Sequence, residues 1–177
     1  MNSKPNKEYL KLIFVVAILL LILFGFALYV SYPLLSAKKA VLATRPIDPF
    51  DPLRGQYITI RYDINSIPLL EGAKVGDDVY VILQDDSEGI SRYVESSFDK
   101  PSRDKLFIRG KVISVDGDTM GVEYGIEQYF FERGATFESG VSEVEVKLSD
   151  SGSSRINRLL SNGQPVKIIY RNKTLGS

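Results

Sequence analysis

An unbroken apolar run at residues 12–30 dominates the pattern of hydrophobic and polar positions along the chain. At about 19 residues without a charge, it has the length that an α-helix needs to cross the roughly 30 Å hydrocarbon core of a bilayer. The pattern predicts one transmembrane helix, in contact with the lipid bilayer through residues 12–32. Pro33 is expected to end the helix, because its ring and its missing N–H disfavour continuation.

A cleaved signal peptide is the alternative for this segment, because Lys4, Lys7 and Lys11 place positive charge before the apolar run. Signal peptides have a shorter apolar core and small residues at the cleavage site. The best candidate site here, Leu-Ser-Ala at residues 35–37, has a bulky leucine at the first key position. We therefore interpret residues 1–37 as a cytoplasmic tail and an uncleaved signal anchor. Basic residues flank the run on both sides, but the short tail favours an extracytoplasmic location for the remainder of this single-pass cell-membrane protein.

Residues 38–177 are expected to form one domain, in which apolar and polar positions alternate with a period of two between turn-forming residues. This alternation is typical of antiparallel strands that bury one face. Asp116-Gly117 and Asn162-Gly163 each join two alternating segments and predict hairpins. Strands are predicted within residues 41–46, 56–64, 78–83, 90–95, 106–124, 129–131, 144–148, 156–160 and 166–170. The fold class predicted is therefore mainly β, an N-terminal transmembrane helix followed by a small antiparallel β-barrel or sandwich-like domain. Only residues 134–142 suggest a short helix in this domain.

Charge and missing residue types narrow the chemistry of the domain. The chain has 22 basic and 22 acidic residues, and three of the lysines and one of the glutamates precede the domain. The resulting slight acidic excess disfavours nucleic acid as a partner, because nucleic-acid binding needs a basic patch. The chain has no cysteine and no histidine, which removes disulfides, thiolate nucleophiles and the commonest general base and transition-metal ligand. No cofactor and no metal are predicted.

Two blocks of the sequence are similar to a known family. The first block is DPFDPLRGQYITIRY, with the motif residues Asp48, Asp51, Gly55, Tyr57 and Tyr62. The second block is RGKVISVDGDTMGVEYGIEQYFFERG, which contains a YGIE run with Gly125 and Glu127. In order and spacing the two blocks resemble the GDYXXLXY family of membrane-anchored bacterial proteins, although Gln56 stands in place of the acid and Ile60 in place of the leucine.

The resemblance extends over most of residues 40–170. It implies a single-span protein of unknown biochemical function that is often associated with larger multi-span membrane proteins. It implies no established catalytic residues, and the glutamine at position 56 argues against a role that needs a carboxylate there.

Alternation in the first block divides its side chains between two faces. Ile58, Ile60, Tyr62 and Ile64 share the predicted core face, and the Tyr62 hydroxyl is expected to reach a partner at the edge of the core. Tyr57 lies on the opposite face and is expected to be the more exposed tyrosine.

The second block carries aromatic residues on both faces of one strand. Tyr129 and Phe131 share one face, and Phe130 lies on the other. Because large exposed apolar patches are uncommon on monomers, one face is expected to meet another part of the chain, the membrane surface or a partner protein. The residues predicted to bind are Tyr57, Tyr129, Phe130 and Phe131, and packing within the sheet is the alternative role for them.

Acidic residues beside the two blocks could hold a hard cation such as calcium. These residues are Asp48, Asp51, Glu123, Glu127 and Glu132. No loop has the regular ligand spacing of a calcium-binding loop, so turns and solvated faces are the preferred explanation for them.

A membrane-anchored hydrolase of the Ser/Lys signal-peptidase type is the alternative function. The chain resembles signal peptidases in combining an anchor with a β-rich domain, and a buried Lys111 could act as a general base. No Ser-Met pair follows the anchor, however, and Ser31 and Ser36 lie in or beside the helix end. We therefore predict that the protein is not an enzyme but a binding or assembly module for membrane partners.

Overall fold

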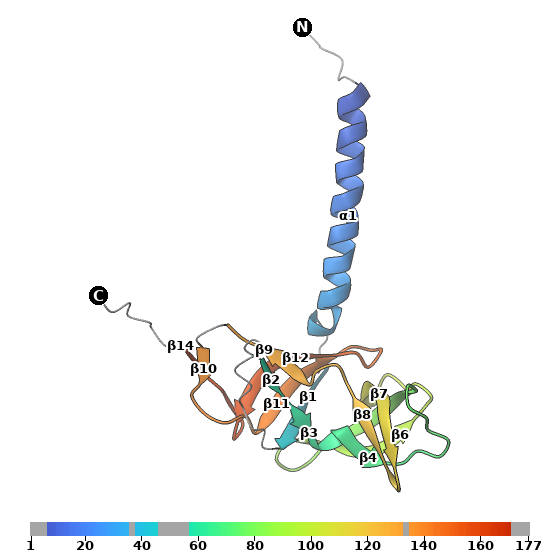
Figure 1. Cartoon of the computed structure of the whole chain (residues 1–177), viewed down its shortest axis with the longest axis vertical. Coiled ribbons are helices and arrows are strands. Elements are labelled where there is room, and N and C mark those ends of the chain that lie inside the picture. Colours follow the sequence, from blue (N-terminus) through green and yellow to red (C-terminus); the bar gives the residue numbers. More distant parts are fainter. Residues whose placement is uncertain (1–6, 36–37, 46–56, 133–134, 171–177) are drawn as a thin grey trace, which may run out of the picture.

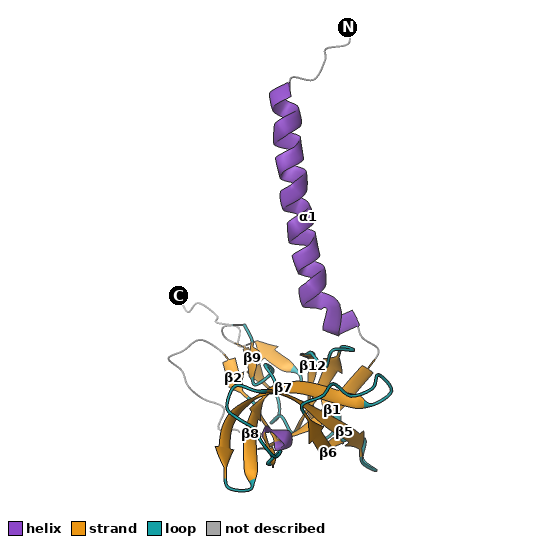
Figure 2. Ribbon diagram, turned by 90° about the vertical axis from the view of Figure 1, so that its right-hand side faces the viewer, coloured by secondary structure: helices purple, strands orange, loops and turns teal. Residues whose placement is uncertain are grey.

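A single long helix extends away from a compact β domain in the computed structural model, which describes residues 7–35, 38–45, 57–132 and 135–170 (Figure 1). Helix α1 (Lys7–Leu35) is long and apolar enough between Lys11 and Ser31 to cross a membrane. The helix continues to Leu35, so the predicted end before Pro33 is wrong. Near the end of a helix a proline removes only one backbone hydrogen bond, and Figure 2 shows the ribbon changing direction there.

The β domain is built from short strands and one 3₁₀ turn. The strands in the described part are β1 (Lys38–Arg45), β2 (Tyr57–Thr59), β3 (Arg61–Tyr62), β4 (Ser66–Pro68), β5 (Asp78–Asp85), β6 (Ser91–Ser97), β7 (Leu106–Asp116), β8 (Thr119–Glu123), β9 (Gln128–Phe130), β10 (Ala135–Phe137), β11 (Glu143–Leu148), β12 (Ser154–Ser161), β13 (Gln164–Pro165) and β14 (Ile168–Tyr170), with the 3₁₀ turn η1 (Asp63–Asn65) after β3.

The strands pair in an antiparallel manner within two five-stranded sheets. One sheet has the order β13-β12-β11-β1-β3 and the other the order β4-β8-β7-β5-β6, while β2–β9 and β10–β14 form two-stranded ribbons. Together they make a nearly closed, barrel-like arrangement. The prediction of a mainly β chain with one apolar N-terminal helix and a small antiparallel β domain is confirmed.

One hydrophobic core fills the space between the two five-stranded sheets. One sheet contributes Leu42, Val144, Val146 and Leu148, and the other contributes Val79, Val81, Ile108, Met120 and Val122. The predicted core face of the first block is confirmed, because Ile58, Ile60, Tyr62 and Ile64 are all buried. The block is nevertheless not one strand. Asn65 Oδ1 accepts a hydrogen bond from the Tyr62 backbone N–H at 2.6 Å, and the chain turns into η1 there.

Both predicted turns occur where the sequence places them. Gly117 lies between β7 and β8 with φ 54°, and Asn162 and Gly163 between β12 and β13 have φ 50° and 75°. Positive φ at both central residues makes the Asn162-Gly163 turn a type I′ turn, which Asn-Gly tolerates best. In the β7–β8 hairpin the two-residue loop is Gly117-Asp118, and the positive φ lies at Gly117, as in a type II′ turn.

Two expectations for the C-terminal third of the domain are wrong. The Asn162-Gly163 turn pairs β12 with only the two residues of β13, whereas β14 pairs with the distant strand β10. The segment expected to form a short helix at residues 134–142 contains β10 instead, with Phe137 opposite Ile168. Long-range pairing supplies hydrogen bonds that local sequence does not reveal.

Candidate binding surface and the turn that supports it

The YGIE run of the second block forms a turn that is closed by its own glutamate. Gly125 has φ 76°, a conformation that glycine adopts without strain. The Glu127 side chain folds back, so that Oε1 accepts a hydrogen bond from the Tyr124 N–H at 2.6 Å and Oε2 accepts one from the Ile126 N–H at 2.9 Å. A carboxylate thus satisfies two backbone donors that the turn leaves without strand partners.

Asn65 links this turn to the first block. Its Nδ2 donates to the Val122 carbonyl at 2.8 Å and to Glu127 Oε1 at 3.2 Å, while its Oδ1 accepts from the Tyr62 N–H. One amide side chain therefore bonds the end of β3, the end of β8 and the turn that follows β8.

Two buried tyrosines, one from each block, form hydrogen bonds to the backbone of the other block. The Tyr62 hydroxyl donates to the Ile126 carbonyl at 2.8 Å, and the Tyr124 hydroxyl donates to the Ile64 carbonyl at 2.7 Å. Burial raises the pKa of both tyrosines, and the negative charge of Glu127 raises it further, so both hydroxyls stay protonated as donors. The prediction that Tyr62 is a core residue with a bonded hydroxyl is confirmed. We call Tyr62, Asn65, Tyr124 and Glu127 the tyrosine clamp.

The tyrosine clamp sets the register of the adjoining β2–β9 ribbon. The Ile60 N–H donates to the Glu127 carbonyl at 2.7 Å, and from there Ile58 pairs with Tyr129 and Tyr57 with Phe130. The ribbon lies on the side of the domain nearest to α1 in both views (Figures 1 and 2). An exposed ribbon with few strand neighbours is thereby held in a fixed place.

The outer face of this ribbon presents an aromatic pair. The centroid of the Phe130 ring lies 5.7 Å from that of the half-buried Tyr57 ring, and Phe130 is 71% exposed. Tyr57 is more exposed than Tyr62, as predicted. We call Tyr57 and Phe130 the aromatic surface.

The other two predicted binding residues point into the domain. The Phe131 and Tyr129 rings are half-buried and lie 4.9 and 6.4 Å from the Phe137 ring of β10. Their packing joins the two ribbons. Phe130 is therefore the exposed member of the predicted binding set, and half-buried Tyr57 lies beside it on the outer face of the ribbon.

Most of the motif residues described by the structure meet in the tyrosine clamp. Tyr62 and Glu127 belong to it, and Gly125 shapes its turn. Asp48, Asp51, Gly55 and Gln56 lie outside the described residues. The sequence interpretation missed Tyr124 and Asn65 as partners; Tyr124 opens the YGIE run and could have been included, whereas no sequence pattern marks Asn65.

The acidic residues considered for a cation are dispersed. Glu127 is engaged by backbone and amide donors, Glu123 is exposed at the end of β8, and Glu132 hydrogen-bonds Tyr170 and raises the pKa of that phenol through its charge. Within the described ranges, no three acidic side chains come together as a metal-binding group. Asp48 and Asp51 lie outside those ranges.

Lys111, the candidate base of the hydrolase alternative, is exposed on β7, opposite Asp78 of β5 and Glu123 of β8. A lysine base needs burial, which this position lacks. Ser31 is exposed near the end of α1, and Ser36 lies outside the described residues. The arrangement gives the hydrolase alternative no support at Lys111.

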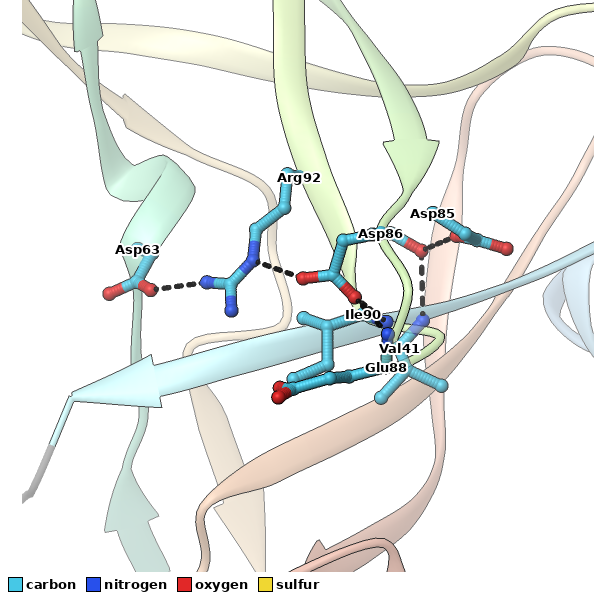
Figure 3. Close-up of polar contacts among 8 residues, drawn as sticks. Val41, Asp63, Asp85, Asp86, Glu88, Ile90 and Arg92 are labelled. Carbon is cyan, nitrogen blue, oxygen red and sulfur yellow. Dashed lines mark hydrogen bonds and ion pairs between the residues drawn. The ribbon is translucent and has the colours of Figure 1, made fainter.

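A second polar network stabilises the turn between β5 and β6 (Figure 3). Asp86 Oδ1 accepts hydrogen bonds from the Ile90 and Glu88 N–H groups at 3.0 and 2.9 Å, and Arg92 donates to Asp86 at 3.0 Å and to Asp63 at 3.2 Å. The Ile90 N–H and the Arg92 guanidinium hold the pKa of Asp86 below its usual range. The sequence interpretation assigned no role to this turn, although an aspartate two residues before a backbone N–H is a known turn signal.

The same network joins the two sheets. Buried Ser91 donates to Asp85 at 2.6 Å and accepts from the Val41 N–H of β1 at 3.2 Å. Beside it is a cavity of about 270 Å³ between β1, η1, β4 and β6. Small-molecule sites typically begin at about 300 Å³, so this cavity is a weaker candidate site than the aromatic surface.

The fold and the tyrosine clamp define the class of protein: one apolar helix of membrane-spanning length followed by a mainly β domain. A family model described as "GDYXXLXY protein" matches residues 19–159. The chain belongs to the GDYXXLXY family, as the two blocks indicated. Comparisons with the curated proteins and with the solved structures found no match.

Proposed function

We propose that this protein is a single-pass cell-membrane protein whose extracytoplasmic β domain binds a membrane partner through the aromatic surface. The observation that carries the proposal is the exposure of Phe130 on a ribbon that the tyrosine clamp holds in place. Aromatic side chains in fixed positions provide much of the energy of protein interfaces, because little freedom is lost when they are buried. The best candidate partner is a multi-span membrane protein.

The anchor is supported by the environment of α1. Apolar side chains between Lys11 and Ser31 are exposed rather than packed on the β domain, whereas the core helix of a water-soluble protein would be covered. A bilayer would supply the missing cover, and the bulky leucine at the candidate cleavage site supports retention of the segment.

Membrane fractionation tests the anchor. We expect the full-length protein to stay in the pellet after an alkaline carbonate wash, because about 19 apolar residues hold a helix in the bilayer far more firmly than surface contacts do. A soluble product with the mass of a chain that starts near Lys38 would show cleavage and contradict the proposal.

Replacing Phe130 with serine tests the aromatic surface. We expect at least a tenfold loss of co-purifying membrane partner in mild detergent, since removing a central aromatic anchor costs about 2 kcal/mol or more of binding free energy. The amount of partner is measured by quantitative mass spectrometry. Val94→Ser on β6 is the matched control, because Val94 is also an exposed apolar residue, 48% accessible, on a short strand.

Both variants should unfold at the same denaturant concentration as the unmodified protein, because both side chains are largely exposed. If Phe130→Ser and Val94→Ser retain the same set of partners in the same amounts, the aromatic surface is not the binding site.

A further inference from the structure

The sheet with the order β4-β8-β7-β5-β6 ends in two edge strands that run in the same direction. Each neighbouring pair in this sheet is antiparallel, so four reversals of direction separate β4 from β6. An antiparallel sheet that closes into a barrel needs an even number of strands, because each strand must oppose both of its neighbours. Five strands cannot meet this condition, whereas a sixth strand of opposite direction can pair with both edges.

A cavity lies between these two edges. It has a volume of about 270 Å³ and is bordered on both sides by edge-strand residues, which are Ser66, Ile67 and Pro68 of β4 and Ser91, Arg92 and Tyr93 of β6. Buried Leu42, Ile64 and Ile67 also line it and connect it with the hydrophobic core. Figure 3 shows the Arg92 side chain extending from its strand to Asp63 of η1, with 3.2 Å between Nη1 and Oδ2. The cavity is small for a separate small molecule, but only one face of an added strand needs to enter it.

The free edge of β6 directs backbone groups away from its own sheet. The Asp86 N–H donates to the Ile90 carbonyl, and bonding alternates along an antiparallel pair, so Ser91 and Tyr93 direct their N–H and carbonyl groups away from β5. Strand β1 meets this edge through a side chain, because the Ser91 hydroxyl accepts the Val41 N–H. Among the strands that the structure describes, none pairs with this edge of β6.

The free edge of β4 has the same construction, with a proline in it. The Leu69 N–H donates to the Asp118 carbonyl, so Ser66 and Pro68 direct their backbone groups away from β8. Proline is tolerated there because the missing N–H costs no bond within the sheet. The Ser66 N–H and the carbonyls of both residues are therefore directed toward a neighbouring strand position, and such edges act as templates for another chain.

We propose that an extended segment of a partner protein binds in this cavity as a sixth strand, antiparallel to both β4 and β6. Main-chain hydrogen bonds to two edges provide affinity, and the side chains on one face of the segment enter the apolar cavity and provide specificity. The charged residues in the cavity lining are Asp63 and Arg92, which pair with each other. The entering side chains are therefore apolar.

This strand site is separate from the aromatic surface. Strands β4 and β6 lie at the end of the domain that points away from α1 (Figure 1). The proposal therefore depends neither on the anchor nor on the partner proposed for Phe130.

Random octapeptides displayed on phage provide the probe, selected on the full-length protein in detergent. Ser66→Trp is the blocked variant, because Ser66 is exposed and lines the cavity. Thr119→Trp is the matched control. Thr119 is exposed on β8 directly opposite Pro68, so it shares the same face of the sheet, but it does not line the cavity.

We expect the selected peptides to alternate apolar and polar residues, because one face of an added strand meets the core and the other meets water. The best of them, as a synthetic peptide, should bind Ser66→Trp at least tenfold more weakly than the unmodified protein and should bind Thr119→Trp equally well. N-methylation of either of two consecutive central amides should weaken binding about tenfold, because consecutive amides of an inserted strand bond opposite edges.

Amide hydrogen exchange measured by nuclear magnetic resonance tests the same site without a substitution. When the synthetic peptide saturates the unmodified protein, the Ser66 and Tyr93 N–H groups should exchange at least tenfold more slowly. The Gln164 N–H of β13, an edge strand of the other sheet, should exchange at an unchanged rate. This measurement decides the question even if Ser66→Trp does not fold.

Three results would overturn the proposal. The first is a selection that yields no peptide able to protect the Ser66 and Tyr93 amides. The second is sensitivity to only one of the two N-methyl groups, which would show addition to a single edge. The third is a dimer in analytical ultracentrifugation that Ser66→Trp abolishes, which would show that a second copy of the chain occupies the position.

Discussion

Replacing Gly110 with alanine is expected to lower the free energy of unfolding of the β domain by about 3 kcal/mol. Gly110 is buried in β7, and a Cβ atom there would lie 2.3 Å from Val122 Cγ1 and 2.8 Å from Tyr124 Cδ1. Tyr124 cannot move away freely, because its hydroxyl is bonded to the Ile64 carbonyl. Alanine also restricts the unfolded chain more than glycine does, which stabilises the folded state by at most about 1 kcal/mol. This stabilisation does not offset the overlap.

Urea unfolding of the full-length protein in detergent, followed by near-ultraviolet circular dichroism of its ten tyrosines, measures the change. Gly140→Ala is the matched control, since a Cβ atom at Gly140 meets no atom within 4 Å. The control should unfold within about 0.5 kcal/mol of the unmodified protein. Equal stability of the two variants would mean that the core beside Gly110 is looser than the structure indicates.

Replacing Glu127 with alanine is expected to destabilise the domain by about 2 kcal/mol. The change removes the acceptor for three donors, the Tyr124 and Ile126 N–H groups and Asn65 Nδ2. Because Glu127 is half-buried, water can hydrogen-bond to some of the donors that lose their acceptor. The loss of free energy of unfolding therefore stays below that for three fully buried, unsatisfied donors. The same unfolding measurement applies.

Glu123→Ala is the control for Glu127→Ala, because Glu123 is an exposed glutamate four residues away on β8. It should change the free energy of unfolding by less than about 0.5 kcal/mol. A small effect of Glu127→Ala would show that the turn at Gly125 holds its conformation without the carboxylate.

The tyrosine clamp shows how far sequence reasoning reached at the candidate site. Alternation placed Tyr62 on the core face, and the paired blocks singled out Gly125 and Glu127, which the structure brings together. Neither the alternation nor the paired blocks showed that the Glu127 side chain closes the turn in which it lies. They also did not show that the Tyr124 hydroxyl bonds the first block while the Tyr62 hydroxyl bonds the second. The two tyrosine hydroxyl bonds join residues 64 and 60 positions apart, and periodicity carries no information about such distant partners. The Glu127 bonds are local, but they depend on a side-chain conformation that the pattern of residues does not specify.

The apolar run, the period-two alternation and the Asp-Gly and Asn-Gly turns determined by themselves that the chain has one long apolar helix and an antiparallel β domain. These features depend on local backbone preference and on which face of a strand is apolar, and both are written in consecutive residues. Only the tertiary structure decided that residues 135–137 are a strand, because β14 provides their hydrogen bonds. It also decided that Phe130 is exposed while Phe131 packs on Phe137. When both faces of a strand are aromatic, the identity of the neighbouring element, and not the strand's own pattern, determines which face is buried.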